Sequence, residues 1–429
     1  GTKLDAEVVK NNLDAYRGKY DGRSPLLFVF VLQNIKAVDV TDPMTVTITT
    51  KTPWPALPSF LYSSGRLGMS AQAQLDSKDN CDKDLIGTGP FKLKEWKLND
   101  HFTAVKNPDY WQKDADGTQL PYLDEIEYRP VPDTDSRVEG VQTGQFDMIH
   151  TNGGEAVSQL QPLADSGTIN MIANSDAAEV TYLMANEAKA PFDNLDARKA
   201  VAYGINREEF KKLRAAGLQD VASGPFAPGN LGYLEDTGFP EFDVAKAKEH
   251  AAAYKKATGK DLSFTMSYAA DASTKISAEL LQSQLADSGI EMKLTSTDQA
   301  ALIDRAIGGD FELAYFRNHP GGDPDNQYVW WHSSSPVNFG KINDPQVDKA
   351  LDDGRVESDE AKRAGIYEGM NERFADQVHN IWLIWSLWTV SSQPNVHGVF
   401  GPDVDGEKPF TGLASGHPVT GLWVDGGGA

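Results

Sequence analysis

The sequence predicts an α/β fold built from at least two domains. At 429 residues the chain is longer than one hydrophobic core usually serves, so two or more domains are expected. The clearest unit spans residues 261–297, where an alternating stretch precedes a helical stretch from Ser273 and a second alternating stretch after Gly289. Its apolar positions are Leu262, Phe264, Met266 and Tyr268, then Ile276, Leu280, Leu281 and Leu285, then Ile290, Met292 and Leu294. Such a unit is expected to hold its strands parallel, with a right-handed crossover.

Further elements support the α/β assignment. A helix is expected over residues 299–307, ended by Gly308 and Gly309, and a third strand over 311–316. The other expected elements are a helix over 4–16, hairpin strands at 91–96 and 102–105, a helix over 134–144, a strand over 146–149, a loop over 151–154, and a loop entering a helix within 191–214 that Asp193 or Asn194 caps.

The composition argues against several classes of partner. Asp and Glu outnumber Lys and Arg by 62 to 40, and the formal charge of -22 repels nucleic-acid backbones and anionic lipid surfaces. Cys81 is the only cysteine, so neither a disulfide within the chain nor a cysteine-based zinc site is expected. The histidines show no pair at the spacing of a metal site, and we expect neither metal nor cofactor. No apolar stretch approaches the ~20 residues that cross a bilayer.

The motifs of common hydrolases and nucleotide-binding proteins do not occur in the sequence. There is no Gly-x-Ser-x-Gly elbow, no His-Glu-x-x-His helix and no P-loop. Residues 114–117 and 403–406 resemble calcium loops, but Leu123 and Gly412 stand where the last glutamate of an EF-hand would follow, so turns are expected. A glycosidase-like enzyme stays a remote alternative, because no paired acid motif can be located.

A candidate binding site follows the third strand. Open α/β sheets bind ligands beyond the carboxyl ends of their strands. Arg317, Asn318 and His319 occupy this place and are expected to point into a cleft. Arg317 can only donate hydrogen bonds, whereas Asn318 and His319 can donate or accept. The trio therefore suits a ligand with carboxylate, carbonyl or hydroxyl oxygens better than one led by an ammonium group.

The residues after this trio extend the hypothesis. Two glycines would let the backbone approach a ligand, and Asp323, Trp330 and Trp331 are further candidates. The structural alternative is that Asp323 caps a helix with Pro324 at its first position. Both interpretations can hold together, with Asp323 structural and Arg317 to His319 facing the cleft.

Three tryptophans, Trp382, Trp385 and Trp388, lie three apart in the apolar stretch 381–390. Residues three apart on a strand face opposite sides, so all three cannot face one site. Trp385 is the candidate for lining a cleft, and core packing is expected for the other two. Aromatic rings stack on sugars and also pack against peptide side chains, so they do not decide the ligand class.

Residues 1–9 read GTKLDAEVV, residues 87–91 read GTGPF, and residues 107–111 read NPDYW. These segments resemble the GTPLTAEDV stretch, the GTGPF signature and the following motif of the family 5 extracellular solute-binding proteins. That family serves ABC importers for dipeptides, oligopeptides, nickel chelates and some oligosaccharides. Further segments similar to the family lie at 121–126, 144–147, 182–186, 191–193, 198–201 and 205–207.

The resemblance implies a two-lobed fold like that of periplasmic binding proteins (type II, cluster C-like), with mixed sheets flanked by helices and a hinge between lobes. Asn152 and Gly153 in a loop of lobe one, and Tyr182 on the strand that crosses into lobe two, become further cleft candidates. The implied division is residues 1–85 as the remnant of an extra subdomain of lobe one, 86–180 completed by 400–429 as lobe one, and 181–399 as lobe two.

The function that the resemblance implies is binding without catalysis. The protein would capture a peptide-like or other small oligomeric solute and pass it to the membrane permease of an ABC importer. It would be monomeric and lie outside the cytoplasmic membrane, either periplasmic or lipid-anchored. An oligosaccharide that stacks on Trp330, Trp331 and Trp385 is the alternative solute within the family.

Two departures from the family limit what the resemblance implies. Relatives carry several dozen residues ahead of the stretch at 1–9, and we expect a missing segment, because the helix over 4–16 would otherwise lose packing partners. Peptide-binding relatives also carry an aspartate shortly before the DPDN stretch, which pairs with the ligand's amino terminus. Here His319, Pro320 or Gly321 holds that place. A free ammonium would lose a partner worth about 1.5–3 kcal/mol, which argues against ordinary peptide specificity.

Overall fold

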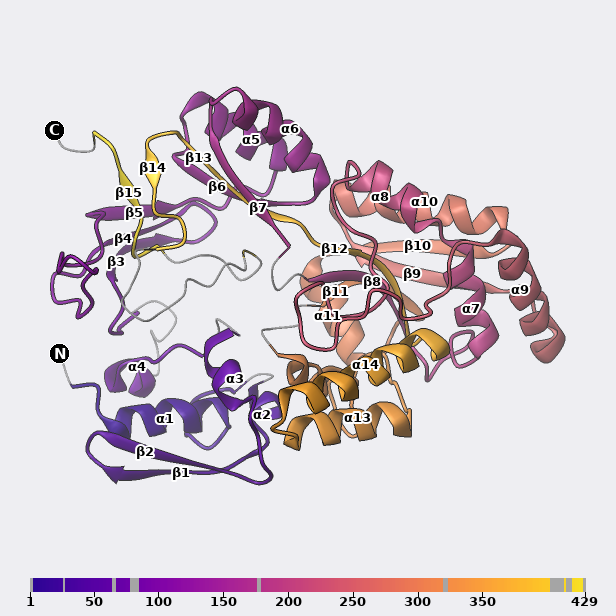
Figure 1. Ribbon diagram of the computed structural model, residues 1–429, viewed down its shortest axis with the longest axis horizontal. Coiled ribbons are helices and arrows are strands. Elements are labelled where there is room, and N and C mark those ends of the chain that lie inside the picture. Colours follow the sequence, from indigo (N-terminus) through magenta and orange to yellow (C-terminus); the bar gives the residue numbers. More distant parts are fainter. Residues whose placement is uncertain are drawn as a thin grey trace.

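The computed structural model describes residues 3–25, 28–63, 67–77, 85–175, 179–318, 323–401, 413 and 419–426. Two α/β lobes stand side by side, and the chain's first elements form a separate unit below them (Figure 1). We call them the first lobe, with the sheet β6-β13-β7, the second lobe, with the sheet β10-β9-β11-β8-β12, and the N-terminal unit, residues 3–77.

The second lobe is built on a mixed five-stranded sheet. β9 (Ser263–Ala269) is parallel to β10 (Glu291–Thr297) and to β11 (Leu313–Asn318), as predicted, whereas β8 (Val180–Ala185) is antiparallel to β11 and to β12 (Asn380–Trp385). Every residue of β8 and β12 is buried, because helices and loops cover this part of the sheet. The helical elements of the lobe are α7 (Leu195–Gly204), α8 (Arg207–Arg214), α9 (Val244–Thr258), α10 (Ala272–Asp287), α11 (Gln299–Gly308), the 3-10 turn η1 (Pro324–Gln327), α12 (Tyr328–Trp331), α13 (Pro345–Val356) and α14 (Glu360–Gln377).

Side-chain caps explain where these helices begin. Asp271 accepts a hydrogen bond from the Thr274 amide at 2.8 Å, so α10 starts one residue before the predicted Ser273. Asn194, one of the two predicted caps, accepts from the amides that open α7. The helical stretch predicted up to residue 214 is divided into α7 and α8, because Asn206 caps a new helix there.

The first lobe has a three-stranded sheet with β13 (Trp388–Ser392) in the middle, antiparallel to β6 (Met148–Asn152) and β7 (Asn170–Asn174). Its helices are α5 (Thr134–Thr143) and α6 (Gly154–Asp165). β6 begins two residues later than predicted. The amides of Gln145 and Phe146 still bond to the Gly140 carbonyl of α5, so the strand cannot start before that turn is complete.

The stretch 381–390, expected as one strand, is two strands in different lobes. β12 ends at Trp385 in the second lobe, and β13 starts at Trp388 in the first lobe. The amide of Ser386 donates to the carbonyl of Glu179, which ends the ladder between β12 and β8. Because β7 and β8 also lie in different lobes, the chain passes from the first lobe to the second between these two strands, and it returns at 386–387.

The N-terminal unit has its own small core around Leu13, Leu32 and Phe60. Its elements are α1 (Ala6–Tyr16), α2 (Phe28–Val31), β1 (Ile35–Asp42), β2 (Thr45–Thr50), α3 (Leu57–Ser63) and α4 (Gln72–Asp76).

The predicted hairpin is present as β3 (Phe91–Lys97) and β4 (His101–Lys106), extended by β5 (Glu125–Tyr128) into an antiparallel sheet. A short pair, β14 (Val396–His397) and β15 (Trp423–Val424), lies beside this sheet (Figure 1).

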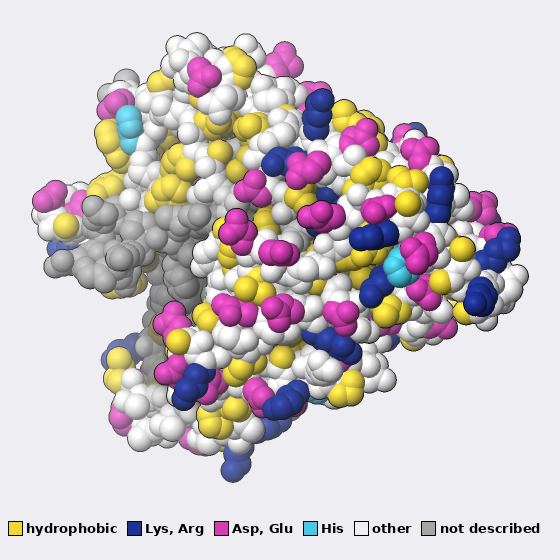
Figure 2. All heavy atoms as spheres, turned by 45° about the vertical axis from the view of Figure 1, so that its right-hand side comes forward, with side chains coloured by type: hydrophobic (Ala, Val, Ile, Leu, Met, Phe, Trp, Pro, Cys, Tyr) yellow, Lys and Arg dark blue, Asp and Glu magenta, His cyan; other side chains and the backbone are white. Residues whose placement is uncertain are grey.

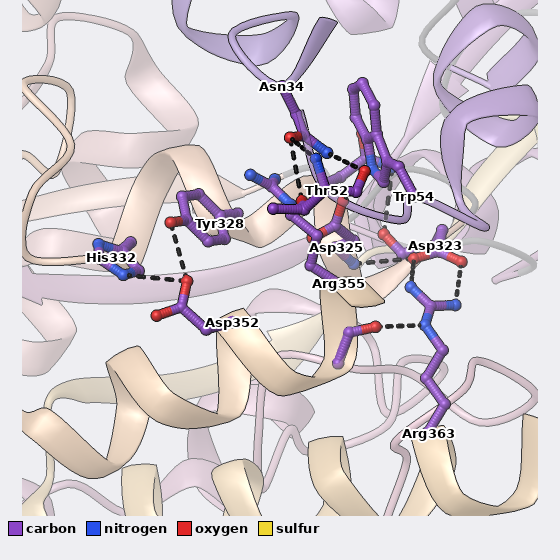
Figure 3. Close-up of polar contacts among 12 residues, drawn as sticks. Asn34, Thr52, Trp54, Asp323, Asp325, Tyr328, His332, Asp352, Arg355 and Arg363 are labelled. Carbon is purple, nitrogen blue, oxygen red and sulfur yellow. Dashed lines mark hydrogen bonds and ion pairs between the residues drawn. The ribbon is translucent and has the colours of Figure 1, made fainter. Parts of the chain in front are cut away.

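Trp54 of the N-terminal unit bonds to a buried ion pair of the second lobe, Arg355 with Asp325 (Figure 3). Trp54 Nε1 donates to Asp325 Oδ2 at 2.6 Å, and Arg355 Nε donates to Asp325 Oδ1 at 2.8 Å. The Arg355 guanidinium also lies 3.5 Å from the centroid of the Tyr328 ring. These contacts attach the N-terminal unit to the second lobe, while the expectation that residues 1–85 form a subdomain of lobe one stays a prediction.

Candidate functional site

A cavity of about 800 Å³ lies between the two lobes. The first lobe contributes the beginnings of α5 and α6, and the second lobe contributes α8, the beginnings of α10 and α11, and the ends of β9 and β11. Asn152 at the end of β6 and Arg317 near the end of β11 therefore face the same space. This is the edge of an α/β sheet at which ligands are expected to bind.

Several helices begin at the cavity wall. Gly153 precedes α6 with φ +91° and offers no side-chain cap, so amide groups of the first turn remain available. α10 presents Ser273 and Thr274 from its first turn. Because the amino-terminal end of a helix carries a partial positive charge, these ends favour negatively charged groups in the cavity.

Three arginines line the cavity, Arg137 from the first lobe and Arg214 and Arg317 from the second. Burial lowers the pKa of Arg137, although Asp133 opposes this effect. Between the two arginines of the second lobe, burial raises the pKa of Tyr315 to about 12, although Ser277 and both guanidiniums lower it. The Tyr315 hydroxyl is thus a neutral group near physiological pH, able to donate a hydrogen bond.

The two lobes touch beside the cavity. The Gly153 amide donates to the carbonyl of Leu387 at 3.0 Å, which continues the ladder between β6 and β13 up to this junction. A Cβ atom on Gly154 would lie 1.8 Å from the carbonyl oxygen of Ala215, so the start of α6 approaches the end of α8 as closely as only glycine allows. Glu155 Oε2 lies 3.9 Å from Arg214 Nη2 across the same junction.

The family model of the bacterial extracellular solute-binding proteins, family 5 (middle region), matches residues 1–340. The chain belongs to this family. The glutathione-binding protein GsiB of Salmonella paratyphi A is 30% identical over 298 residues, 70% of this chain and 56% of that protein, so the chain spans little more than half of that relative. The nickel-binding periplasmic protein of Escherichia coli is 24% identical over 430 residues, covering 96% of this chain and 80% of the relative.

Solved structures of similar fold agree with this membership. The periplasmic binding protein AgaA of A. tumefaciens, in complex with agropinic acid, superposes with a TM-score of 0.85 at 24% identity, covering 99% of this chain and 84% of that one. DppA of Helicobacter pylori, in complex with the peptide STSA, gives 0.81 at 24% identity, covering 94% and 80%. The two-lobed binding-protein fold expected from the sequence is therefore confirmed.

Within this family 5 protein, three of the predicted site residues line the cavity: Asn152, Gly153 and Arg317. Arg317 Nη1 lies 3.4 Å from Glu179 Oε2, so its charge is partly balanced by the second lobe itself. Asn318 is buried, and its amide donates to Gln327 Oε1 at 2.5 Å instead of lining the cavity. His319 lies outside the described residues.

Asp323 has the structural place that the alternative interpretation gave it. It caps η1, with Pro324 at the first position, by accepting from the Asp325 amide at 2.8 Å. Both of its carboxylate oxygens also accept from Arg363, at 2.6 and 2.5 Å (Figure 3). These bonds hold the start of η1 against α14.

The aromatic candidates lie in the core of the second lobe. Trp331 packs on Phe374 with ring centroids 4.7 Å apart, and the half-buried Trp330 meets Phe339 edge-on. Trp385 and Tyr182 are both buried, and neither is among the residues that line the cavity. Trp382 is fully buried, as expected, whereas Trp388 lies in the first lobe and stacks on His150.

Arg214, Tyr315 and the serines of α10 are cavity residues that the sequence alone did not identify. The sequence placed Ser273 at the start of a helix after a strand, which is the signal that could have found it. Arg214 gave no such signal, because it reaches the cavity only through the packing of α8 beside α10.

The described residues contain no group of three or more His, Cys, Asp or Glu side chains placed to hold a metal ion. No helix in the described ranges is long and apolar enough to span a membrane. Acidic side chains are scattered over the visible face, among basic ones, and do not form a single patch (Figure 2). The charge on this face therefore gives no indication of a nucleic-acid interface.

Proposed function

We propose that the protein captures a small peptide-like or other oligomeric solute between its lobes and delivers it to the membrane permease of an ABC importer. The observation that carries this proposal is the cavity of about 800 Å³ with walls from both lobes. Its size suits a ligand of several residues or a comparable small molecule. Family membership and the ligands named for relatives, glutathione, nickel, agropinic acid and a tetrapeptide, support it.

Closure of the two lobes on the solute would be the conformational change that captures it. The connections between β7 and β8 and between β12 and β13 join lobes that otherwise have separate sheets. A solute that contacts both walls stabilises the closed arrangement over the open one, and this difference shifts the population. The permease would then recognise the closed form.

The two carboxylates of the DPDN stretch are not free to bind an ammonium group. Asp323 is paired with Arg363, and Asp325 accepts from both Arg355 and Trp54 (Figure 3). Neither lies among the residues that line the cavity. This stretch therefore offers no carboxylate to the amino terminus of a solute, in agreement with the missing aspartate noted in the sequence.

Neither alternative has comparable support. An oligosaccharide would need exposed aromatic faces, but Trp331 and Trp385 are buried in the second lobe and Trp330 is half-buried. The family that the chain belongs to is one of binding proteins and not of enzymes. We place the protein outside the cytoplasmic membrane, periplasmic or lipid-anchored, as a monomer that needs no cofactor.

Mass spectrometry of the purified protein tests the proposal. Native spectra should show one solute per chain, and denaturation should release a peptide-like or similarly small molecule that rebinds in calorimetric titration. Release of an oligosaccharide would favour the alternative solute. Turnover of the released compound, abolished by one carboxylate substitution, would instead indicate an enzyme.

A further inference from the structure

Arg214 combines burial with a fixed orientation. It is the last residue of α8, and its side chain in the cavity wall is 11% exposed. Its Nε donates to Ser277 Oγ at 3.0 Å, and its Nη2 donates to the carbonyl oxygen and Oγ of Ser273 at 3.1 and 2.9 Å. Because these partners are neutral, they orient the guanidinium without balancing its charge.

The charge of Arg214 is not matched by a bonded carboxylate. Its Nη1 donates to no residue in the described part of the chain. The described ion-pair partner is Glu155 of the first lobe, 3.9 Å from Nη2 and beyond hydrogen-bond distance. The Glu155 side chain is 60% exposed, so water and salt screen this pair.

The other two arginines of the cavity are held differently. Arg317 is 49% exposed and lies 3.4 Å from Glu179. Arg137 belongs to the first lobe and donates to two backbone carbonyls and to Thr134, while its buried Nε has no partner in the described part of the chain. Arg214 is the cavity arginine of the second lobe that three hydrogen bonds to neutral partners hold in place, while its charge and one donor group remain available.

The surroundings of Arg214 favour an anion. Besides Glu155, four carboxylates belong to the described cavity wall, and each has a partner. Asp133 and Asp271 cap α5 and α10, Asp135 accepts from Gln159, and Glu179 lies beside Arg317. The first turns of α6 and α10 direct the positive ends of their dipoles toward the cavity. A carboxylate that enters beside Arg214 would meet oriented donors on both lobes.

We propose that Arg214 binds a carboxylate of the solute through its free Nη1 group, and that the cleft thereby selects solutes that carry an acidic group. This inference rests on the proposed function and names the class of solute for the same site. The bond would be charge-assisted and shielded from water in the closed cleft, which strengthens it. Glu155, which lies beside the same guanidinium, would be displaced by the entering carboxylate.

Two matched pairs of probes test this inference in calorimetric titrations. Reduced glutathione is compared with its diethyl ester, and the peptide Ser-Thr-Ser-Ala with a free carboxyl terminus is compared with its amide. The acid form should bind the parent protein more tightly than the neutral form. Arg214→Gln should weaken the acid form roughly 5- to 150-fold and leave the neutral form within about twofold. Arg214→Lys, which keeps the charge, should fall between.

Two control variants distinguish carboxylate binding by Arg214 from a general charge effect and from an ion pair between the lobes. Arg129→Gln removes an exposed positive charge directly after β5 and should bind like the parent. Glu155→Gln removes the competing carboxylate and should leave the affinity for the acid form unchanged or higher. If Glu155→Gln lowers the affinity as much as Arg214→Gln does, the two residues act only as an ion pair between lobes, and the inference is wrong.

The remaining outcomes also decide the question. The role of Arg214 is wrong if Arg214→Gln binds the acid form as tightly as the parent does. It is also wrong if the parent binds the acid and neutral forms equally. If neither pair of probes binds, the titrations are repeated with the solute released from the purified protein. A released solute without an acidic group would overturn the inference about Arg214. A parent protein that holds no solute at all contradicts the proposed function itself.

Discussion

Replacing Gly154 with alanine perturbs the contact between the lobes beside the cleft. The added Cβ would lie 1.8 Å from the carbonyl oxygen of Ala215, whereas real Cβ atoms essentially never come within 3.0 Å of such an atom. The two backbones would have to separate by about 1 Å or more. Both residues are buried at helix ends, so the lobes themselves have to move apart.

The size of the effect follows from the cost of overpacking. An extra methyl group in a close-packed contact costs about 1–3 kcal/mol. If the lobes adopt this contact when they close on a solute, the cost falls on the bound state and weakens affinity roughly 5- to 150-fold. Each lobe should still fold, because Gly154 lies in its own lobe's helix without a positive φ.

Calorimetric titration of the released solute measures the affinity, and small-angle X-ray scattering measures the radius of gyration with and without solute. Gly369→Ala is the matched control, because a Cβ at that position of α14 meets no atom within 4 Å. We expect weaker binding and a larger liganded radius for Gly154→Ala, and parent-like values for Gly369→Ala. Parent-like values for both variants would refute the reasoning.

Two further predictions concern stability. Asp323→Asn leaves the buried Arg363 without its carboxylate partner. Urea unfolding should show a free energy of unfolding lower by about 3–5 kcal/mol, with little change in solute affinity. A loss of affinity at unchanged stability would contradict the structural role of Asp323. Burial lowers the pKa of His379, but its bonds to Asp344 and Glu187 raise it overall. That stabilisation is complete below the ordinary pKa of about 6.5 and is lost as the pH rises through the folded value, so the melting temperature should fall as the pH rises above about 6.5. His379→Gln should flatten this dependence, and an equal slope in both proteins would count against it.

The α/β units could be predicted where one face of an element is exposed. In β9 and α10 the apolar residues recur at two different periods, and a cap and a glycine mark the helix ends. The stretch around Ser386 offered no such pattern, because β12 is buried on both faces and β13 is nearly so. Alternation disappears in such strands, so the crossing between lobes could not be seen in the sequence.

The cleft could be predicted only in part for a related reason. The rule that ligands bind beyond the carboxyl ends of strands led to Arg317, and the family resemblance added Asn152; both line the cavity. It could not separate Arg317 from Asn318, whose amide turns inward to Gln327. Residues such as Arg214 come to the cavity through the packing of one helix on another, which a single sequence does not display.

The tryptophans show how composition can mislead about a site. Trp330 and Trp331 follow the candidate loop directly, but they belong to the short helix α12, which points Trp331 toward Phe374 in the core. An aromatic residue near a loop is thus as readily a packing residue as a binding one. Whether such a tryptophan packs in the core or lines the cavity is decided by its burial in the folded structure and not by its position along the chain.

A crystal structure of the protein with its released solute tests the central claim most directly. We predict electron density for one solute inside the cavity, in contact with residues of α6 in the first lobe and of α10 in the second. A solute that contacts only one lobe, or that lies outside the cavity, would contradict capture between the lobes.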